Sequence, residues 1–263
     1  MQPTTSGRFR VHDRRPRPTG DDDDTLAEFV LVELPDEPID PADPEANEAY
    51  DPLYAIAEGY EDDLADRIDG LDPGTVVDAT LAWNDGTARV TELSVVRESR
   101  FRFADDIEGM FEAAVETWRS IRADGEALGS ITTKSTDGEP NGALYLFADG
   151  PGTDTFHEVR SGRLPIEPLI ARVNDRRADG DPREVFVLRP AAHDFVAVYV
   201  VFERDGVLAR TVRDTYDLGE GLAAGLDGPG NDDGLGDDDG QGDDDGPGDG
   251  DEGNVGFDIT DRL

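Results

Sequence analysis

The sequence predicts an α+β protein with three successive parts: a small five-stranded β-barrel, an antiparallel sheet with helices, and a disordered acidic tail. Three observations predict this order. Strand-like segments dominate the first part of the chain. Helical and strand patterns then alternate through the middle. Residues 218–254 are mostly Asp and Gly, a composition that cannot bury enough apolar surface to fold.

The predicted barrel has a short helix between its third and fourth strands. We expect strands over residues 7–11, 26–34, 53–59, 74–83 and 87–103, and the helix over 62–69. Asn84-Asp85-Gly86 supplies a tight turn between the last two strands. A change of apolar parity between Val90 and Leu93 predicts a β-bulge near Thr91. This order of elements is that of an OB (oligonucleotide/oligosaccharide-binding) barrel, and other small barrels share it.

The second half opens with the clearest helix pattern, an apolar stripe over residues 107–121. Asp105 and Glu108 resemble a capping box at its start, and Gly125 is a plausible stop. The remaining expected elements are strands near 130–134 and 143–148, a short helix over 154–160, a helix over 165–176 beginning at Pro165, and a meander of strands over 184–189, 195–203 and 207–212. Residues 195–202 are nearly all apolar, which predicts a central strand covered on both faces.

These patterns divide the chain into four regions. We expect an OB-like barrel over residues 1–104, an α+β lobe over 105–217 and a disordered tail over 218–254. In residues 255–263, Val255, Phe257 and Ile259 alternate with smaller or polar residues. This is the pattern of a short strand that could add to a sheet edge of this chain or of a partner, and the alternative is a frayed terminus.

Charge is the strongest compositional signal. The 263 residues carry a formal net charge of -38, and Lys134 is the only lysine. Because like charges repel across a compact surface, this load is tolerable where abundant salt screens it. The chain contains no cysteine, and its longest apolar run is far too short to span a membrane. We therefore expect a cytoplasmic protein adapted to high salt.

Four segments resemble an uncharacterised family of haloarchaeal proteins. They are residues 74–83 (GTVVDATLAW), 136–148 (TDGEPNGALYLFA), 183–190 (REVFVLRP) and 207–216 (VLARTVRDTY). The resemblance covers roughly residues 7–217 and agrees with the high-salt interpretation. It implies no activity, ligand or catalytic residue.

The loop over residues 132–142 is the most concentrated polar segment between apolar strands. It contains Lys134, which could attract an anion, together with Asp137, Glu139 and Asn141, which could bind a cation or accept a proton. These four residues are candidate ligand-binding residues. The alternative is an ordinary solvated hairpin connection shaped by Gly and Pro.

The N-terminal arginines form the one basic island that the sequence shows. Arg8, Arg10, Arg14 and Arg15 are candidate nucleic-acid contacts, because the first strand and first loop of an OB barrel border its ligand face. Asp21–Asp24 offset this charge locally, and high salt weakens phosphate contacts. Stacking on aromatic side chains would survive salt better.

No motif for catalysis, a metal or a cofactor stands out. His12, His157 and His193 lie in separate predicted elements without ligand spacing, and carboxylates are too numerous to single out an acid/base pair. The leading interpretation is a non-catalytic binding or interaction protein, with an unidentified protein as a possible partner, no membrane and no cofactor. The alternatives are an enzyme that acts on an anionic small molecule with the 132–142 loop, or an OB-type nucleic-acid binder.

The high-salt interpretation predicts salt-dependent folding. As salt falls below about 1 M, weaker screening should destabilise residues 1–217, and their native circular dichroism spectrum should be lost. A spectrum that stays native at about 0.1 M salt would contradict this interpretation.

Overall fold

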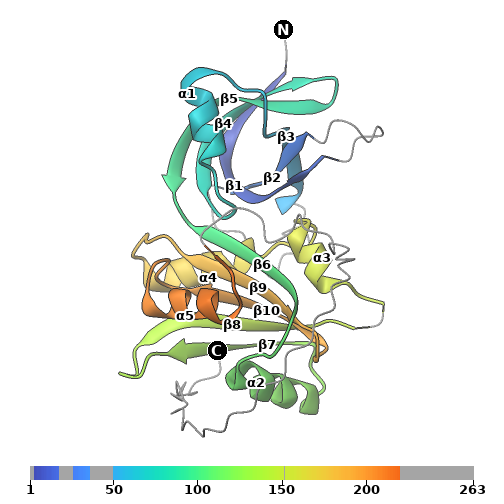
Figure 1. The fold of residues 1–263 in the computed structure, drawn as a ribbon, viewed down its shortest axis with the longest axis vertical. Helices are drawn as coiled ribbons and strands as arrows, with labels where there is room; N and C mark the ends of the chain where they lie inside the picture. The colour runs from blue at the N-terminus through green and yellow to red at the C-terminus, as the bar shows by residue number, and fades with distance from the viewer. Residues whose placement is uncertain (1–2, 18–25, 36–49, 151, 220–263) are drawn as a thin grey trace, which may run out of the picture.

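The first half of the chain forms the predicted closed barrel. The computed structural model describes residues 3–17, 26–35, 50–150 and 152–219 (Figure 1). The barrel strands are β1 (Thr4–Pro16), β2 (Ala27–Glu33), β3 (Pro52–Ile56), β4 (Val76–Asn84) and β5 (Thr87–Arg97), and α1 (Asp62–Asp69) lies between β3 and β4. The strands close in the order β1-β2-β3-β5-β4, with β3 parallel to β5 and the other pairs antiparallel. This is the OB order.

Alternating side chains build the barrel interior. Phe9 and Val11 of β1 point inward beside Phe29 and Leu31 of β2, all of them buried in one apolar cluster. The predicted turn is present, with both Asp85 and Gly86 at positive φ. The β4–β5 ladder shifts register between Thr80 and Leu81, which confirms the bulge at Thr91.

The predicted long strand over residues 87–103 is wrong, because the structure contains two strands there. The chain leaves the barrel after β5, and β6 (Arg100–Ile107) pairs with β9 in the second sheet. The Arg100 N–H donates to the Arg183 carbonyl at 2.8 Å. Both halves have strand character, so the pattern gave no sign of the change of sheet.

The second sheet is covered by helices on both faces. Its strands are β6, β7 (Leu128–Lys134), β8 (Pro140–Ala148), β9 (Glu184–Pro190) and β10 (Phe195–Val201), in the order β6-β9-β10-β8-β7. One face packs against α2 (Glu112–Ala123) and α5 (Val207–Thr215), and the other against α3 (Thr155–Arg160) and α4 (Glu167–Arg177). We call this sheet with its helices the second lobe. Strand β10 is central and buried at every residue, as its apolar run predicts.

Three sequence expectations in the second lobe are corrected. Residues 207–212 are helical, not a strand, because Leu208, Ala209 and Val212 bury one helical face in the core. Helix α2 begins at Glu112 rather than near residue 107, because Ile107 still belongs to β6. Asp105 and Glu108 therefore cap nothing, and Phe111 occupies the N-cap without a side-chain bond.

Other boundaries follow the predictions more closely. Helix α2 ends at Ala123 and is followed by Gly125 at positive φ, as predicted. Helix α4 begins at Glu167, two residues after Pro165, so Pro165 is not its first residue. The predicted tail begins at residue 218, but Leu218 is described and is buried in the core of the second lobe. The rest of the tail from residue 220 and the predicted strand at 255–263 lie outside the described residues.

The backbone at Gly74 packs directly against the start of β6, where the two lobes meet. It has φ +98°, and a Cβ there would lie 2.5 Å from the Arg100 carbonyl carbon and the Phe101 nitrogen. Next to it, the Phe101 N–H donates to the Pro73 carbonyl. No side chain fits between these backbones.

Gly74→Ala should therefore lower the free energy of unfolding by about 3 kcal/mol, from left-handed backbone strain together with steric overlap. Gly86→Ala is the matched control, because Gly86 also has positive φ but nothing lies within 4 Å of the Cβ that alanine would add. It should cost about 1–2 kcal/mol. Urea unfolding in about 3 M KCl measures both. Equal losses would show that the contact with β6 contributes nothing.

Candidate binding surfaces

The hairpin that joins β7 and β8 separates the four candidate ligand residues. Asn141 is half-buried and bonds through its side chain to Thr133, which also accepts a hydrogen bond from Tyr199. Asp137 and Glu139 lie exposed at the tip, and Lys134 is half-buried at the end of β7. The structure therefore joins Asn141 to the sheet and leaves the two carboxylates facing solvent.

The tip of this hairpin is held by local bonds. The Ser135 N–H donates to the Glu139 carbonyl at 2.8 Å, and the Gly138 N–H donates to the Ser135 carbonyl at 2.9 Å. Gly138 has positive φ, as such a turn requires. The glycine in this loop is thus explained by backbone geometry.

The four candidate arginines lie on one strand but point in three directions. Arg8 is on the outer wall of the barrel and forms two hydrogen bonds to the Asp78 carboxylate. Arg14 faces the barrel end and lies over the Phe29 ring. Arg15 points outward again, where its Nε donates to Glu28 at 3.0 Å. Arg10 is buried beneath the second lobe.

The second lobe covers part of the barrel face that OB proteins use for ligands. In that fold, the outer face of the second and third strands binds oligonucleotides or oligosaccharides. Here Val30 and Val32 of β2 are buried on the outside of the barrel, and a Cβ at Gly162 would contact Val30 and Pro52. The His12 ring bonds to the Val159 carbonyl in the same contact. This half of the face is occupied by the protein itself.

On the β3 side of the same face, the surface is only partly covered, because Tyr54 lies directly opposite the buried Val30 and is itself exposed. Tyr54 of β3 is 39% exposed, and the Arg15 guanidinium lies 4.9 Å from the centre of its ring. Leu26 is exposed just before β2. Arg17 donates to the Thr87 hydroxyl at 3.1 Å, which joins the end of β1 to the β4–β5 turn.

A shallow hollow of about 510 Å³ lies on the opposite wall, over β1, β4 and β5. Its polar lining comes from Ser6, Arg8, Asp78, Thr80, Glu92 and Ser94. Cross-strand pairing places these side chains on one face, since Ser6 and Glu92 both pair with Thr80, and Arg8 and Ser94 both pair with Asp78. The Thr80 hydroxyl donates to Glu92 at 3.1 Å and lies 3.0 Å from the Ser6 hydroxyl.

Sequence analysis did not identify this hollow as a site. Of the polar residues that line the hollow, the sequence analysis singled out only Arg8, as a candidate contact for nucleic acid. Serine and threonine on an exposed strand look like ordinary surface positions. The alternation along β4 was the one available signal, because it places Asp78 and Thr80 on the outer face.

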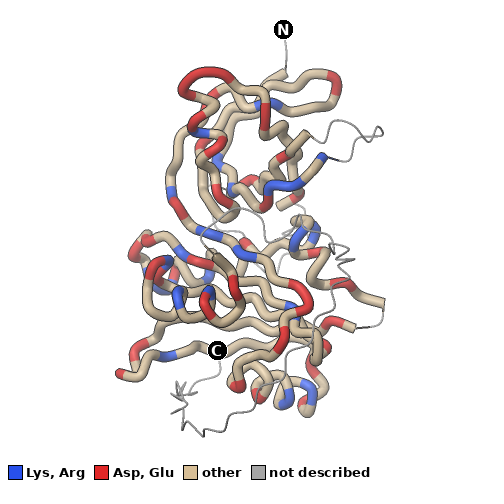
Figure 2. The backbone as a smooth tube through the Cα atoms, viewed as in Figure 1, with Lys and Arg blue, Asp and Glu red and all other residues tan. Residues whose placement is uncertain are grey.

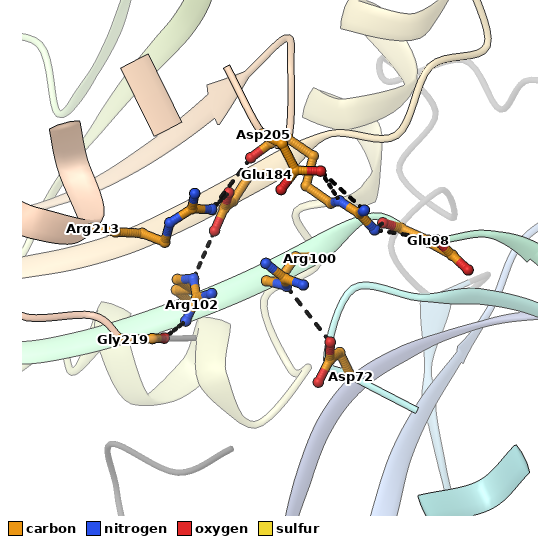
Figure 3. Close-up of polar contacts among 9 residues, drawn as sticks. Asp72, Glu98, Arg100, Arg102, Glu184, Asp205, Arg213 and Gly219 are labelled. Carbon is orange, nitrogen blue, oxygen red and sulfur yellow. Dashed lines mark hydrogen bonds and ion pairs between the residues drawn. The ribbon is translucent and has the colours of Figure 1, made fainter. Parts of the chain in front are cut away.

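An arginine-rich network ties β6 to its neighbours (Figure 3). Glu184 of β9 is fully buried and accepts hydrogen bonds from Arg102 of β6 and Arg213 of α5, both at 2.6 Å. Nearby, Arg204 pairs with Glu98 and Asp205, and Arg100 pairs with Asp72 of the barrel lobe. The hydrogen bonds to Glu184 compensate for the burial of its carboxylate, and the Arg100–Asp72 pair joins the second lobe to the barrel. Both indicate a structural role.

Basic residues elsewhere in the second lobe also pair with carboxylates. Arg189 contacts Asp105, Asp149 and Asp154, and Arg177 and Arg183 share Asp179. These arginines are therefore partnered within ion-pair networks. Figure 2 shows acidic and basic positions interspersed along the described backbone.

Metal and membrane features can be stated for the described part of the chain. Within it, no three His, Cys, Asp or Glu side chains gather as metal ligands. The three histidines lie on β1, on α3 and just before β10. None of the described helices has the length and apolar character needed to cross a bilayer.

Comparison with known proteins places the chain in a family without giving an activity. No curated protein matches it. A match over residues 1–224 covers both lobes and the network around Glu184. The chain therefore belongs to a family of unknown function (DUF6663).

Proposed function

We propose that this protein is a non-catalytic binding module that works in a salt-rich cytoplasm and recognises its ligand with the polar hollow on the barrel wall. The observation that carries the proposal is the convergence of six polar side chains from three strands on one concave surface of about 510 Å³. Concave surfaces with a few convergent polar groups are the usual places for small ligands.

The chemistry of the hollow favours recognition over proton transfer. The hydrogen bond from Arg8 lowers the pKa of the Asp78 carboxyl, so this group stays ionised near neutral pH. A carboxylate held in this way is a poor general acid and a weak base. It remains an acceptor for hydroxyl or amide donors of a ligand.

The charge balance favours a neutral, hydroxyl-rich ligand. One guanidinium faces two carboxylates, those of Asp78 and Glu92, so the hollow carries net negative charge and would repel an anion. Thr80 donates to Glu92 and sits beside Ser6, which forms a chain of hydroxyl groups. Sugars and polyols can replace such bonds one for one.

Thr80→Val tests this proposal by removing the central hydroxyl while keeping the shape of the side chain. Calorimetric titration of a panel of neutral di- and trisaccharides, in about 3 M KCl, should identify a binder for the wild type. The variant should bind it about tenfold more weakly. Absence of any binder in the panel, or equal binding by the variant, would contradict the proposed ligand class.

Lys134→Gln is the matched control. It changes the 132–142 loop in the second lobe, which contributes nothing to the lining of the hollow, and should leave saccharide binding unchanged. If the protein is instead an enzyme using that loop on an anionic substrate, Lys134→Gln is the variant that should lose function. The two substitutions together separate the two classes.

A second candidate function is binding of single-stranded nucleic acid at the exposed β3 side of the OB face. The observation that favours it is the exposed Tyr54 ring with Arg15 stacked on it. A base could stack on this pair, and stacking tolerates salt better than phosphate contacts do.

Tyr54→Ala should weaken binding of a short single-stranded oligonucleotide by about tenfold, with little change in its salt dependence, because a stacking surface and no charge is lost. Fluorescence anisotropy of a labelled oligonucleotide measures this, with Thr80→Val as the control that should bind normally. No detectable binding by the wild type would exclude this function.

A further inference from the structure

Three ionisable side chains are buried together where the barrel meets the second lobe. Arg10 and His12 extend from the outer face of β1, and Glu167 is the first residue of α4. Their exposed fractions are 4%, 0% and 2%. We call these residues the junction triad. Charges so deeply buried are costly unless they compensate one another.

The contacts of His12 fix the position of one of its protons. Its Nε2 lies 2.6 Å from the Val159 carbonyl oxygen. Because a carbonyl oxygen only accepts hydrogen bonds, Nε2 must carry a hydrogen. The other ring nitrogen, Nδ1, lies 3.8 Å from Oε1 of Glu167. A neutral ring would therefore turn a bare lone pair toward a carboxylate, and a second proton on Nδ1 replaces this repulsion with an ion pair.

The Glu167 carboxylate has two basic neighbours, Arg10 and His12. The Arg10 Nε lies 3.6 Å from Oε1 of Glu167. Arg10 Nε, His12 Nδ1 and both oxygens of Glu167 make no hydrogen bond within the described residues. Burial opposes ionisation of Glu167, but His12 and Arg10 outweigh it and lower the pKa of this carboxyl. The contacts of this carboxylate with β1 are therefore contacts between ionisable groups, and none of them is a hydrogen bond.

Other charged groups surround the triad. Asp13 is buried beside His12 and pairs with Arg160 of α3 at 3.6 Å, and burial raises the pKa of the Asp13 carboxyl. Arg97 at the end of β5 opposes the charge of Arg10, and Tyr50 is close enough to feel Glu167. On the remaining side, the rings of Phe101 and Phe103 pack against His12. Charged groups of both signs therefore surround the buried ring.

We propose that the junction triad is a proton-dependent device that sets how firmly the second lobe holds the barrel face. With His12 protonated, the triad joins α4 to β1 by two ion pairs. When the ring loses the Nδ1 proton, Glu167 keeps Arg10 alone and faces a lone pair, so the junction loosens.

The direction of the pH dependence follows from the two groups. The pKa of Glu167 is lowered in the folded protein. Ionised Glu167 therefore stabilises the junction above pH 4.5, its ordinary pKa, and this stabilisation is lost when the pH falls through the folded-state pKa. The ion pair between His12 and Glu167 exists only while Nδ1 carries a proton, so this contact is lost when rising pH removes that proton. The junction should therefore be tightest in mildly acidic solution and looser in alkaline solution.

Hydrogen exchange measured by mass spectrometry on the full chain tests this between about pH 5.5 and pH 9 in high salt, after correction for intrinsic exchange rates. Protection of the peptides that contain Val159 and Glu167 should fall at least about tenfold toward alkaline pH. Peptides from β10 should not change. Equal protection across this range would overturn the proposal.

Two variants test whether His12 causes the pH dependence of protection. His12→Gln can still donate to the Val159 carbonyl but cannot titrate, so its protection should be low and independent of pH. His157→Gln is the matched control, because His157 is exposed on α3, and it should behave as the wild type does. A pH response in His12→Gln equal to that of the wild type would also overturn the proposal.

Nitrogen NMR of the wild-type imidazoles gives an answer even if His12→Gln fails to fold. The chain contains three histidines, which makes assignment practical. Both nitrogens of His12 should be protonated in mildly acidic solution, and Nδ1 should lose its proton first. A neutral ring throughout, or loss of the Nε2 proton first, would contradict the device.

Discussion

The structure depends on the burial of the outer face of β1 and β2 against the second lobe. A closed barrel has no strand edges to offer, so a neighbour must pack on its wall. On this wall, Val30 and Val32 lie beside Arg10 and His12. The start of α4 and the end of α3 pack against them from the second lobe. The apolar residues supply the buried surface area of this contact, and the ionisable residues determine its alignment, because each needs a partner on the other lobe. The remaining exposed surfaces of the barrel, at Tyr54 and over the hollow, are those that this contact leaves available.

Much of the fold could be predicted because local patterns and tertiary packing agree. The Asn84–Gly86 turn, the alternation on β4 and the wholly apolar β10 all act over short distances. The errors arose where one local signal fits two structures. Asp205-Gly206 resembles a hairpin turn, but Gly206 is the N-cap of α5, and the apolar residues after it face the core as a helix. Likewise, β5 and β6 have the same strand-like sequence pattern, although they belong to different sheets.

The candidate residues were harder to predict, because side-chain direction and distant partners decide their roles. The four arginines are close in sequence, but the pleat of β1 and its register shift between Val11 and Asp13 turn them to different surroundings. The partner of Arg10 is Glu167, on a helix that begins far along the chain, and no local motif links the two. The hollow likewise needs three strands to form. The hairpin at 132–142 was identified by composition, and the structure disperses its charged groups.

The way β6 enters the second sheet has a consequence for how the chain folds. Strand β6 follows β5 after two residues and pairs in parallel with β9, which lies far along the sequence. Within the barrel, β1–β2, β2–β3 and β4–β5 pair over short separations, but closure also needs a distant pair, because β1 pairs with β4, for example Thr4 with Ala82. The β6–β9 pairing closes a long loop that contains α2, β7, β8, α3 and α4. Topology of this kind slows folding, so a barrel that forms early would hold β6 as a template on which the rest of the sheet assembles.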